Sequence, residues 1–311
     1  MVVTVNYHNN PMNRHGRKVS VPLFDIGDFF INKRWQLMSR EEQQIDDFDQ
    51  VFASGELEKI TRYRDLEGKR VFITGGGSGI GAYLTAAFAL QGARVSFVSL
   101  RDRAAEQLCN QVEACTGLRP HYATCDIRDL VALESSMQAA VAELGGLDVL
   151  VNNAARDTRH TIDSLTPEQW DESININLRP QFFAMQWAAR EMVKAGGGSI
   201  VNLGSNSANL ALCGYPAYVT AKTAIVGLTR AAARELGQKG IRVNALVPGW
   251  VMTERQKRLW VTEEALAECL AGQSLKFPIQ GEDLVEGALF LASRASRVIT
   301  GQQLIVDGGR V

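Results

Sequence analysis

A tyrosine and a lysine, Tyr218 and Lys222, stand four residues apart in the segment GYPAYVTAKTA. Residues at this spacing lie one above the other on a helix, so the phenol and the ammonium can meet. A free tyrosine has a pKa of about 10, and lowering it toward about 7 takes about 4 kcal/mol. A cation about 4 Å away supplies about that much at an effective dielectric constant of about 20. The pair is therefore a candidate acid and base, although two surface side chains would show the same spacing.

Two more polar residues precede this pair. Ser205 follows the apolar run SIVNLGS, and Asn177 lies in WDESININL. The carboxyl ends of parallel strands open onto the ligand crevice of a sheet, so Ser205 and the start of the next helix can face one substrate. Singly, Ser205 could cap a helix, Asn177 could be a buried structural amide and Lys222 could be solvated. Together the four residues form the predicted catalytic group: Asn177, Ser205, Tyr218 and Lys222.

A glycine-rich run, TGGGSGIGAYL, follows the short apolar run RVFI. Glycine permits positive φ and lets backbone approach a ligand closely, and the N–H groups at a helix start favour an anion. Gly77, Gly79 and Ala82 have the G-x-G-x-x-G/A spacing of dinucleotide-binding turns. A purely structural turn is the alternative, but a turn between strand and helix favours a pyrophosphate. The predicted contacts are Gly75, Gly77, Ser78, Gly79, Ile80 and Gly81.

The end of the second strand decides which dinucleotide is bound. An acid there bonds the ribose hydroxyls of NAD and repels the extra phosphate of NADP. In VSFVSLRDR that position is Ser99, followed by Leu100, Arg101 and Arg103. A serine does not repel a 2′-phosphate, and either arginine can pair with it. NADP is therefore favoured over NAD, although Asp102 among the arginines could still serve NAD.

The elements that must position these residues alternate along the chain from about residue 68 onward. Segments with helical periodicity, several ending at glycine, separate seven short apolar runs: RVFITG, RVSFVSL, PHYATCD, LDVLVNNAA, GSIVNLGS, IRVNALVPG and QQLIVDGG. This alternation predicts one doubly wound α/β domain, a Rossmann fold with a parallel sheet covered by helices, over residues 63–311. Residues 1–62 are expected to form an N-terminal extension that packs on its own subunit or a neighbour. A partner-binding or regulatory segment is the alternative.

Composition excludes several classes of protein. The chain of 311 residues is 46% hydrophobic and 22% charged with a formal net charge of -1, so neither nucleic acid nor a membrane surface is an expected partner. No apolar run is long enough to span a membrane, and the first residues lack the apolar core of a secretory signal. The five cysteines and four histidines show no metal-ligand spacing, so no metal site is expected. A cytoplasmic protein with reduced thiols is the expectation.

From about residue 68 to 311 the chain resembles the short-chain dehydrogenase/reductase family. The motifs TGGGSGIG, CDIRD, NNAA, SININL, YVTAK, VPGW and TGQQLIVDGG carry the resemblance. It implies that Tyr218 is the acid and base, that Lys222 and Ser205 lie beside it, and that Asn177 joins a proton relay. It also implies a homo-oligomer, tetramer or dimer, and cofactor contacts at Asp126, Ile127, Asn152, Asn153, Tyr218, Lys222, Pro248, Gly249, Val251 and Thr253. Ala155 departs from the family's usual glycine, and its methyl group is expected to crowd the turn beside the cofactor.

Within the family, the chain is most similar to aldose 1-dehydrogenases of the D-xylose type. The stretches DTRHTI, WDESININLRPQFF and TERQKRLWVTEEALAECLAGQSLK carry this similarity. It implies oxidation of the C1 hydroxyl of a pentose or hexose to the lactone. Donors for hydroxyls and an indole face for the sugar ring would suit such a substrate, and they are present at Arg159, His160, Arg255, Gln256 and Trp260. The alternative is that the charged members are solvated and Trp260 is core.

Two other functions compete with this one. A carbonyl reductase acting on an oxoacyl or diketo substrate would carry a more apolar segment than TERQKRLWVTEE after Pro248. A cofactor-binding protein without catalysis, acting through its N-terminal extension, would have no need of the four predicted catalytic residues. No metal is required, since the cofactor would accept the hydride and Tyr218 the proton.

Overall fold

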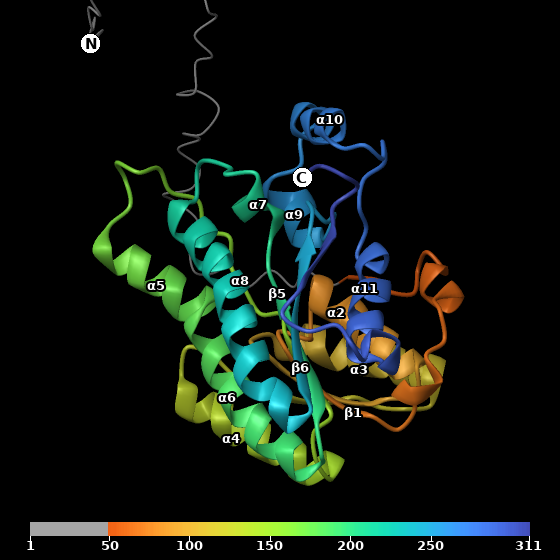
Figure 1. Ribbon diagram of the computed structural model, residues 1–311. Helices are drawn as coiled ribbons and strands as arrows, with labels where there is room; N and C mark the ends of the chain where they lie inside the picture. The colour runs from red at the N-terminus through yellow and green to blue at the C-terminus, as the bar shows by residue number, and fades with distance from the viewer. Residues whose placement is uncertain (1–48) are drawn as a thin grey trace, which may run out of the picture. The chain divides into compact units, whose positions relative to one another are not determined.

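Seven parallel strands form one sheet in the order β3-β2-β1-β4-β5-β6-β7 (Figure 1). The computed structural model describes residues 49–311, so most of the expected N-terminal extension lies outside the described residues. Each of the seven apolar runs contains one strand: β1 (Arg70–Thr74), β2 (Arg94–Ser99), β3 (His121–Thr124), β4 (Val149–Asn152), β5 (Gly198–Leu203), β6 (Ile241–Pro248) and β7 (Gln303–Val306). The strand order reverses between β1 and β4, which is where ligands bind in open α/β sheets. The predicted Rossmann fold is confirmed.

Helices cover both faces of the sheet (Figure 1). One layer contains α2 (Ile80–Leu90), α3 (Asp102–Thr116) and α11 (Glu282–Ala292). The other contains α4 (Leu130–Leu144), α5 (Pro167–Asn177), α6 (Arg179–Lys194) and α8 (Pro216–Leu236). Three short helices lie in the connections at the carboxyl ends of β5 and β6, namely α7 (Asn206–Asn209), α9 (Glu254–Leu259) and α10 (Glu263–Gly272). These connections are therefore placed to line the ligand crevice.

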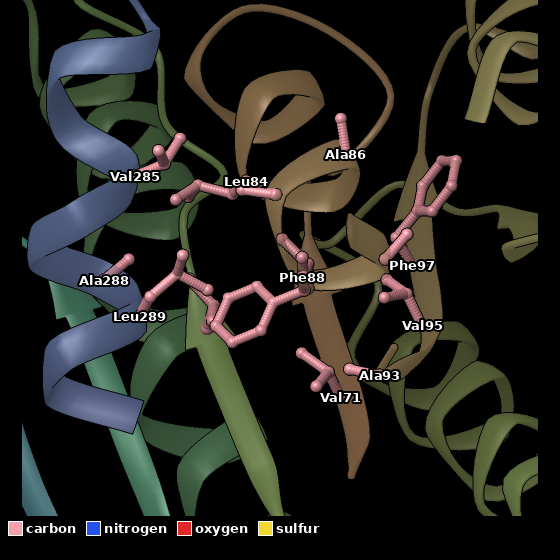
Figure 2. Packing of buried hydrophobic residues seen from close by; sticks show 14 of the residues in the cluster. Val71, Leu84, Ala86, Phe88, Ala93, Val95, Phe97, Val285, Ala288 and Leu289 are labelled. Carbon is pink, nitrogen blue, oxygen red and sulfur yellow. The ribbon is translucent and has the colours of Figure 1, made fainter. Parts of the chain in front are cut away.

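The core consists of two main apolar clusters, one under each helical layer. Figure 2 shows part of the first, in which Leu84 and Phe88 of α2 face Val285 and Leu289 of α11. Each fully buried side chain of this size contributes about 1.5–3 kcal/mol relative to its exposed state. Burial of both sheet faces explains why the strands are continuous apolar runs rather than alternating ones.

Residues 49–66, called the docked segment below, pack against the first cluster. Val51, Leu57 and Leu66 are each at most 1% exposed and belong to that core. Two short 3-10 helices, η3 (Glu56–Lys59) and η4 (Arg64–Leu66), shape the segment. Backbone N–H groups also tie it down, because Thr61 donates to Glu286 at 2.6 Å and Tyr63 donates to Gln91 at 2.8 Å. The part of the expected extension that the structure describes therefore packs on its own chain.

Candidate active site

Tyr218 and Lys222 lie one turn apart near the start of α8. Pro216 provides a favourable first helical residue because its missing N–H would have no partner there. Lys222 is 1% exposed, and its Nζ donates to the carbonyl oxygen of Leu203 at the end of β5, at 2.8 Å. The same Nζ lies 5.7 Å from the centroid of the Tyr218 ring. The predicted helical pair is present, with its ammonium anchored to the sheet.

The electrostatics of this pair differ from the expectation. Burial lowers the pKa of Lys222 from 10.5 to about 7, although the charge of Asp157 opposes the shift. Burial also raises the pKa of Tyr218, and the charge of Asp157 adds to this, whereas a hydrogen bond with Ser205 acts in the opposite direction. The expected lowering of the phenol's pKa is therefore wrong for the chain's own groups. The reason is that burial penalises both charged forms.

Ser205 connects β5 to the helices that carry the pair. It is the N-cap of α7, and its Oγ accepts the backbone N–H of Ser207 at 3.2 Å. That Oγ also lies 2.8 Å from the Ser207 Oγ. A hydrogen bond between Ser205 and Tyr218, which partly opposes the rise in the phenol's pKa, places the hydroxyl and the phenol side by side. The structure thus brings together Ser205, Tyr218 and Lys222.

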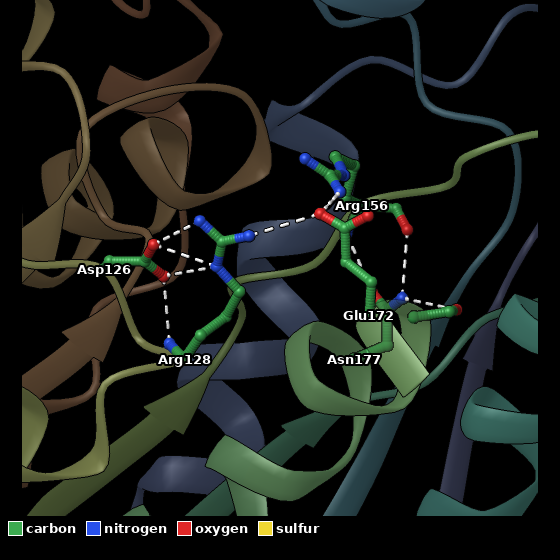
Figure 3. Close-up of polar contacts among 6 residues, drawn as sticks. Asp126, Arg128, Arg156, Glu172 and Asn177 are labelled. Carbon is green, nitrogen blue, oxygen red and sulfur yellow. Dashed lines mark hydrogen bonds and ion pairs between the residues drawn. The ribbon is translucent and has the colours of Figure 1, made fainter. Parts of the chain in front are cut away.

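Asn177 is the last residue of α5 and is fully buried. Its Oδ1 accepts the backbone N–H of Arg156 at 2.8 Å, and its Nδ2 donates to the Arg156 carbonyl at 3.0 Å and to Ser173 Oγ at 3.3 Å (Figure 3). Both polar ends of the amide are engaged with the connection that follows β4. Asn177 therefore holds that connection against α5, and its role in a proton relay stays a prediction.

A chain of charges begins at Asp126, one of the predicted cofactor residues (Figure 3). Arg128 donates to both carboxylate oxygens of Asp126 and to Glu172 at 3.2 Å. Glu172 also accepts from Arg156. The hydrogen bonds of Arg128 lower the pKa of Asp126, so this carboxylate is charged at neutral pH. The neighbouring Ile127 packs partly buried against the second core cluster.

The glycine-rich turn joins β1 to α2 and rests against the end of β4. Gly79 is the N-cap of α2 with φ of 57°, and a side chain at Gly81 would place its Cβ 1.9 Å from the Gly75 carbonyl oxygen. Asn153 Nδ2 donates to the carbonyl oxygens of Thr74 and Gly75, both at 3.0 Å. Asn152 is buried instead and donates to Asn202 on β5 at 2.9 Å. Of these two asparagines, Asn153 therefore fixes the turn.

The hydroxyl of Thr74, which the sequence analysis did not single out, contributes to the same arrangement. It accepts the backbone N–H groups of Asn153 at 3.0 Å and of Ala154 at 3.1 Å. The threonine directly before the glycine run was the available signal. Ala155 is exposed, and crowding of the turn by its methyl group beside a bound cofactor stays a prediction.

Ser99 is the last residue of β2, as the register predicted. It is 7% exposed, and its Oγ accepts the backbone N–H of Arg101 at 3.3 Å. A Cβ on Gly77 would lie 2.7 Å from that Oγ, so Ser99 borders the glycine-rich turn. Leu100 is 67% exposed, and Asp102 accepts a hydrogen bond from Thr124 on β3. Asp102 is thus directed toward the neighbouring strand.

The connection after β6 closes the site from the other side. Gly249 donates its N–H to Val306 at 2.9 Å, and Val251 forms an isolated bridge with Ile279. Thr253 is the N-cap of α9 and accepts the N–H of Gln256 at 3.3 Å. It lies next to the glycine-rich turn, because a Cβ on Gly79 would be 3.7 Å from its Cγ2. Pro248, which ends β6, starts this predicted cofactor-binding connection.

Four of the five predicted substrate residues gather around Asp157, which the sequence analysis missed. Arg255 donates to one carboxylate oxygen of Asp157, and Gln256 donates to the other at 3.0 Å. The Arg159 guanidinium carbon lies 4.0 Å from the Tyr215 ring centroid and 4.3 Å from that of Trp260. We call these six residues the Asp157 cluster: Asp157, Arg159, Tyr215, Arg255, Gln256 and Trp260.

The Asp157 cluster borders the catalytic group. Burial has the largest effect on the pKa values of Tyr218 and Lys222, and the charge of Asp157 has the second largest. The charge acts to raise both pKa values, so it adds to the rise for Tyr218 and opposes the fall for Lys222. Tyr215 adds a second contact, with its ring centroid 5.6 Å from that of Tyr218. The signal for Asp157 was its place in DTRHTI, where only the donors were selected. His160, the fifth predicted substrate residue, does not belong to the Asp157 cluster. Besides burial, the charges that affect its pKa are those of Glu172 and Arg156.

The comparisons with known proteins bear on this geometry. The family model described as Enoyl-(Acyl carrier protein) reductase matches residues 75–310. The chain is 49% identical over 249 residues to the "Probable galactose dehydrogenase GalD" of Rhizobium meliloti (strain 1021), covering 80% of this chain and 97% of the relative. The chain belongs to the short-chain dehydrogenase/reductase family. Such enzymes use a nicotinamide dinucleotide, NAD or NADP.

Two further relatives extend the comparison. The D-xylose 1-dehydrogenase of Caulobacter vibrioides (strain NA1000 / CB15N) is 47% identical over 79% of this chain and 97% of its own length. A solved structure titled as a putative short-chain alcohol dehydrogenase from Sinorhizobium meliloti 1021 superposes with a TM-score of 0.76 at 33% identity, covering 80% of this chain and 98% of that one. Both agree with the family and the fold.

The residues present fit a bound dinucleotide. The N–H of Gly79, at the start of α2, donates to a carboxylate oxygen of Asp49 at 2.6 Å, so this turn accepts an anion. Beside it, Gly77 abuts Ser99 at the end of β2 without room for a side chain. Within residues 49–311 no group of three or more acidic, histidine or cysteine side chains is placed to hold a metal ion. Among the helices of this described part, none combines the length and the apolar composition of a membrane span.

Proposed function

We propose that the chain oxidises the C1 hydroxyl of an aldose, a pentose or hexose, to the lactone. The observation that carries the proposal is the Asp157 cluster beside Tyr218. Asp157 accepts from Arg255 and Gln256, and sugar hydroxyls can both donate to such a carboxylate and accept from such donors. Relatives described as galactose and D-xylose dehydrogenases support this substrate class.

Each residue has a distinct task in the proposed reaction. A dinucleotide held by the glycine-rich turn would supply the acceptor for the hydride that leaves the sugar C1. Ser205 orients the C1 hydroxyl, and Tyr218 takes the proton of that hydroxyl as its own phenolic proton leaves toward the neutral amine of Lys222, a transfer that general bases accelerate by about 10²–10⁴-fold. Lys222, held on the Leu203 carbonyl, supplies a proton-accepting group whose pKa of about 7 lies near neutral pH.

The alternative is a carbonyl reductase acting on an oxoacyl or diketo substrate. Such a substrate presents few hydroxyls to the charged and amide groups around Asp157, so it would form few hydrogen bonds with them. The predicted site is rich in these groups, which favours the sugar.

Spectrophotometry at the nicotinamide absorbance tests this function. The purified chain is mixed with NADP or NAD and a panel of aldoses, simple alcohols and hydroxyacyl compounds. We expect turnover of one or a few aldoses, with Asp157→Asn raising KM for the aldose while leaving nucleotide affinity unchanged. Turnover of hydroxyacyl compounds without any aldose would show that the substrate has been assigned wrongly.

We further propose that NADP is preferred over NAD, because Ser99 leaves room for a 2′-phosphate near Arg101 and Arg103. Replacing Ser99 by aspartate introduces a negative charge at the end of β2. The ratio of kcat/KM for NADP to that for NAD should then fall by at least about tenfold, as 1.4 kcal/mol of repulsion would produce. An unchanged ratio would show that the 2′ position is recognised elsewhere.

We also propose a homo-oligomer in the cytoplasm. Apolar side chains are exposed on α5 and α6, with Trp170 38%, Phe182 42% and Phe183 39% exposed, and such surfaces often mark contacts between subunits. All five cysteines are unpaired, which suits a reducing compartment. Light scattering after size-exclusion chromatography measures the mass, and a monomer at micromolar concentration would refute the oligomer.

A further inference from the structure

A carboxylate from the docked segment occupies the mouth of the glycine-rich turn. Asp49 is only 3% exposed. Its Oδ2 accepts the backbone N–H of Gly79 at 2.6 Å, and its Oδ1 accepts the backbone N–H of Glu254 at 3.2 Å. One side chain thus joins the turn after β1 to the connection after β6, the two backbone segments that border the crevice from opposite sides.

The Gly79 N–H is the kind of group that binds a dinucleotide phosphate. It lies at the start of α2, an 11-residue helix whose N-terminus favours negative charge, and the pyrophosphate of a Rossmann-fold cofactor lies at this place. A single N–H directed at a carboxylate oxygen at 2.6 Å cannot also donate fully to a phosphate oxygen. Two anions within a few ångströms also repel each other. Asp49 therefore stands in for a phosphate.

Asp49 reaches this position because the docked segment is fixed behind it. Val51 and Leu57 are fully or almost fully buried, and the N–H of Val51 donates to the Asp49 carbonyl at 3.0 Å. Further along, the backbone of Thr61 and Tyr63 is bonded to Glu286 and Gln91. Asp49 itself precedes the residues matched by the family model, which begins at 75. The carboxylate therefore comes from a part of the chain that the family model does not cover.

We propose that Asp49 is an internal competitor of the dinucleotide. The docked segment holds the carboxylate on the Gly79 and Glu254 N–H groups, and the cofactor binds after that carboxylate leaves. The apolar anchors at Leu57 and Leu66 remain in place during the exchange, so only the first residues of the segment move. The apparent dissociation constant for the dinucleotide then equals the intrinsic constant divided by the fraction of molecules in which the Asp49 carboxylate has left the Gly79 N–H.

Isothermal titration calorimetry on the full-length chain tests this competition without any sugar. Wild type, Asp49→Asn and Asp49→Ala are titrated with NADP, NAD and inorganic pyrophosphate. We expect Asp49→Ala to bind each of them about tenfold more tightly or better, and Asp49→Asn to bind them more tightly to a smaller degree, because an amide oxygen still accepts hydrogen bonds. The matched control is Asp65→Asn, on the same segment, whose carboxylate caps the Arg294 N–H at 2.7 Å; its affinities should equal those of wild type.

A second readout uses the wild-type chain alone. Hydrogen exchange of the peptide covering residues 49–53 should become faster when NADP is added, because the Asp49 contacts are released. Equal or weaker nucleotide binding by both Asp49 variants, or slower exchange of that peptide with NADP, would overturn the proposal and show that Asp49 supports the turn. If Asp49→Ala does not fold, Asp49→Asn and the exchange experiment decide the question. Neither measurement involves a sugar. A result that overturns the Asp49 proposal would therefore leave the proposed aldose oxidation untouched.

Discussion

At the scale of single residues, the active site is governed by burial as much as by charge. Lys222 is 1% exposed and donates to the carbonyl oxygen of Leu203 on β5. Burial lowers the pKa of Lys222 and raises that of Tyr218, which favours the neutral form of both groups. The spacing of the two residues predicted their helical pairing, because that depends only on local geometry. It could not predict the sign of the phenol's shift, since that depends on how tightly distant segments enclose the pair.

The role of the phenol is tested by Tyr218→Phe, which removes the proton acceptor and keeps the ring. Turnover should fall by at least about 10²–10⁴-fold, the contribution of general acid–base catalysis. Nucleotide affinity measured by calorimetry should change little, and it serves as the control for folding. A variant that retains a substantial part of the wild-type kcat would remove Tyr218 from the proposed mechanism.

The buried lysine makes stability depend on pH. Its pKa is about 7 in the folded chain and 10.5 when exposed, so between these values the unfolded chain binds more protons. The free energy of unfolding should therefore rise as the pH increases through that window, and this rise should be smaller in Lys222→Met. Chemical denaturation at both ends of the window measures it, with the exposed Lys239→Met as control. The same rise in Lys222→Met and wild type would contradict the assignment.

At the scale of elements, the strand ends bring the site together. The ends of β1, β2, β5 and β6 carry Thr74, Ser99, Leu203 and Pro248 to one edge of the sheet. The sequence predicted this edge because alternating runs dictate a parallel sheet. It did not predict the ties between connections, such as Asp157 with Gln256 or Asn177 with Arg156, since those residues are distant in sequence and only packing of the helices brings them into contact.

Replacing Asn177 by alanine tests the tie between α5 and the connection after β4. The change leaves the half-buried N–H and carbonyl of Arg156 without their partner, which should lower the free energy of unfolding by about 1–3 kcal/mol. Urea denaturation measures this loss, and Ser173→Ala, which removes only the bond at 3.3 Å, should cost less. An unchanged stability with reduced kcat would instead assign Asn177 to proton transfer alone.

At the scale of the whole molecule, the catalytic core extends beyond the boundary that sequence periodicity suggests. The strands and helices after residue 68 can be predicted from the regular spacing of their apolar residues. Residues 49–66 do not, because they are short 3-10 turns and extended chain whose few apolar residues have no period. Their anchors, Val51 and Leu57, are recognisable only once α2 and α11 provide the surface that buries them.

This packing leads to a prediction that concerns the molecule as a unit. Leu57 is 1% exposed in the core cluster that includes α2 and α11, so Leu57→Ala should lower the free energy of unfolding by about 2–5 kcal/mol. The neighbouring Glu58→Ala, at an exposed position of the same short helix, should change it by less than about 0.5 kcal/mol. Because the segment belongs to the same core, unfolding monitored by tryptophan fluorescence and by circular dichroism should shift together. A loss for Leu57→Ala no larger than that of its control would mean that residues 49–66 contribute nothing to the stability of the domain they cover.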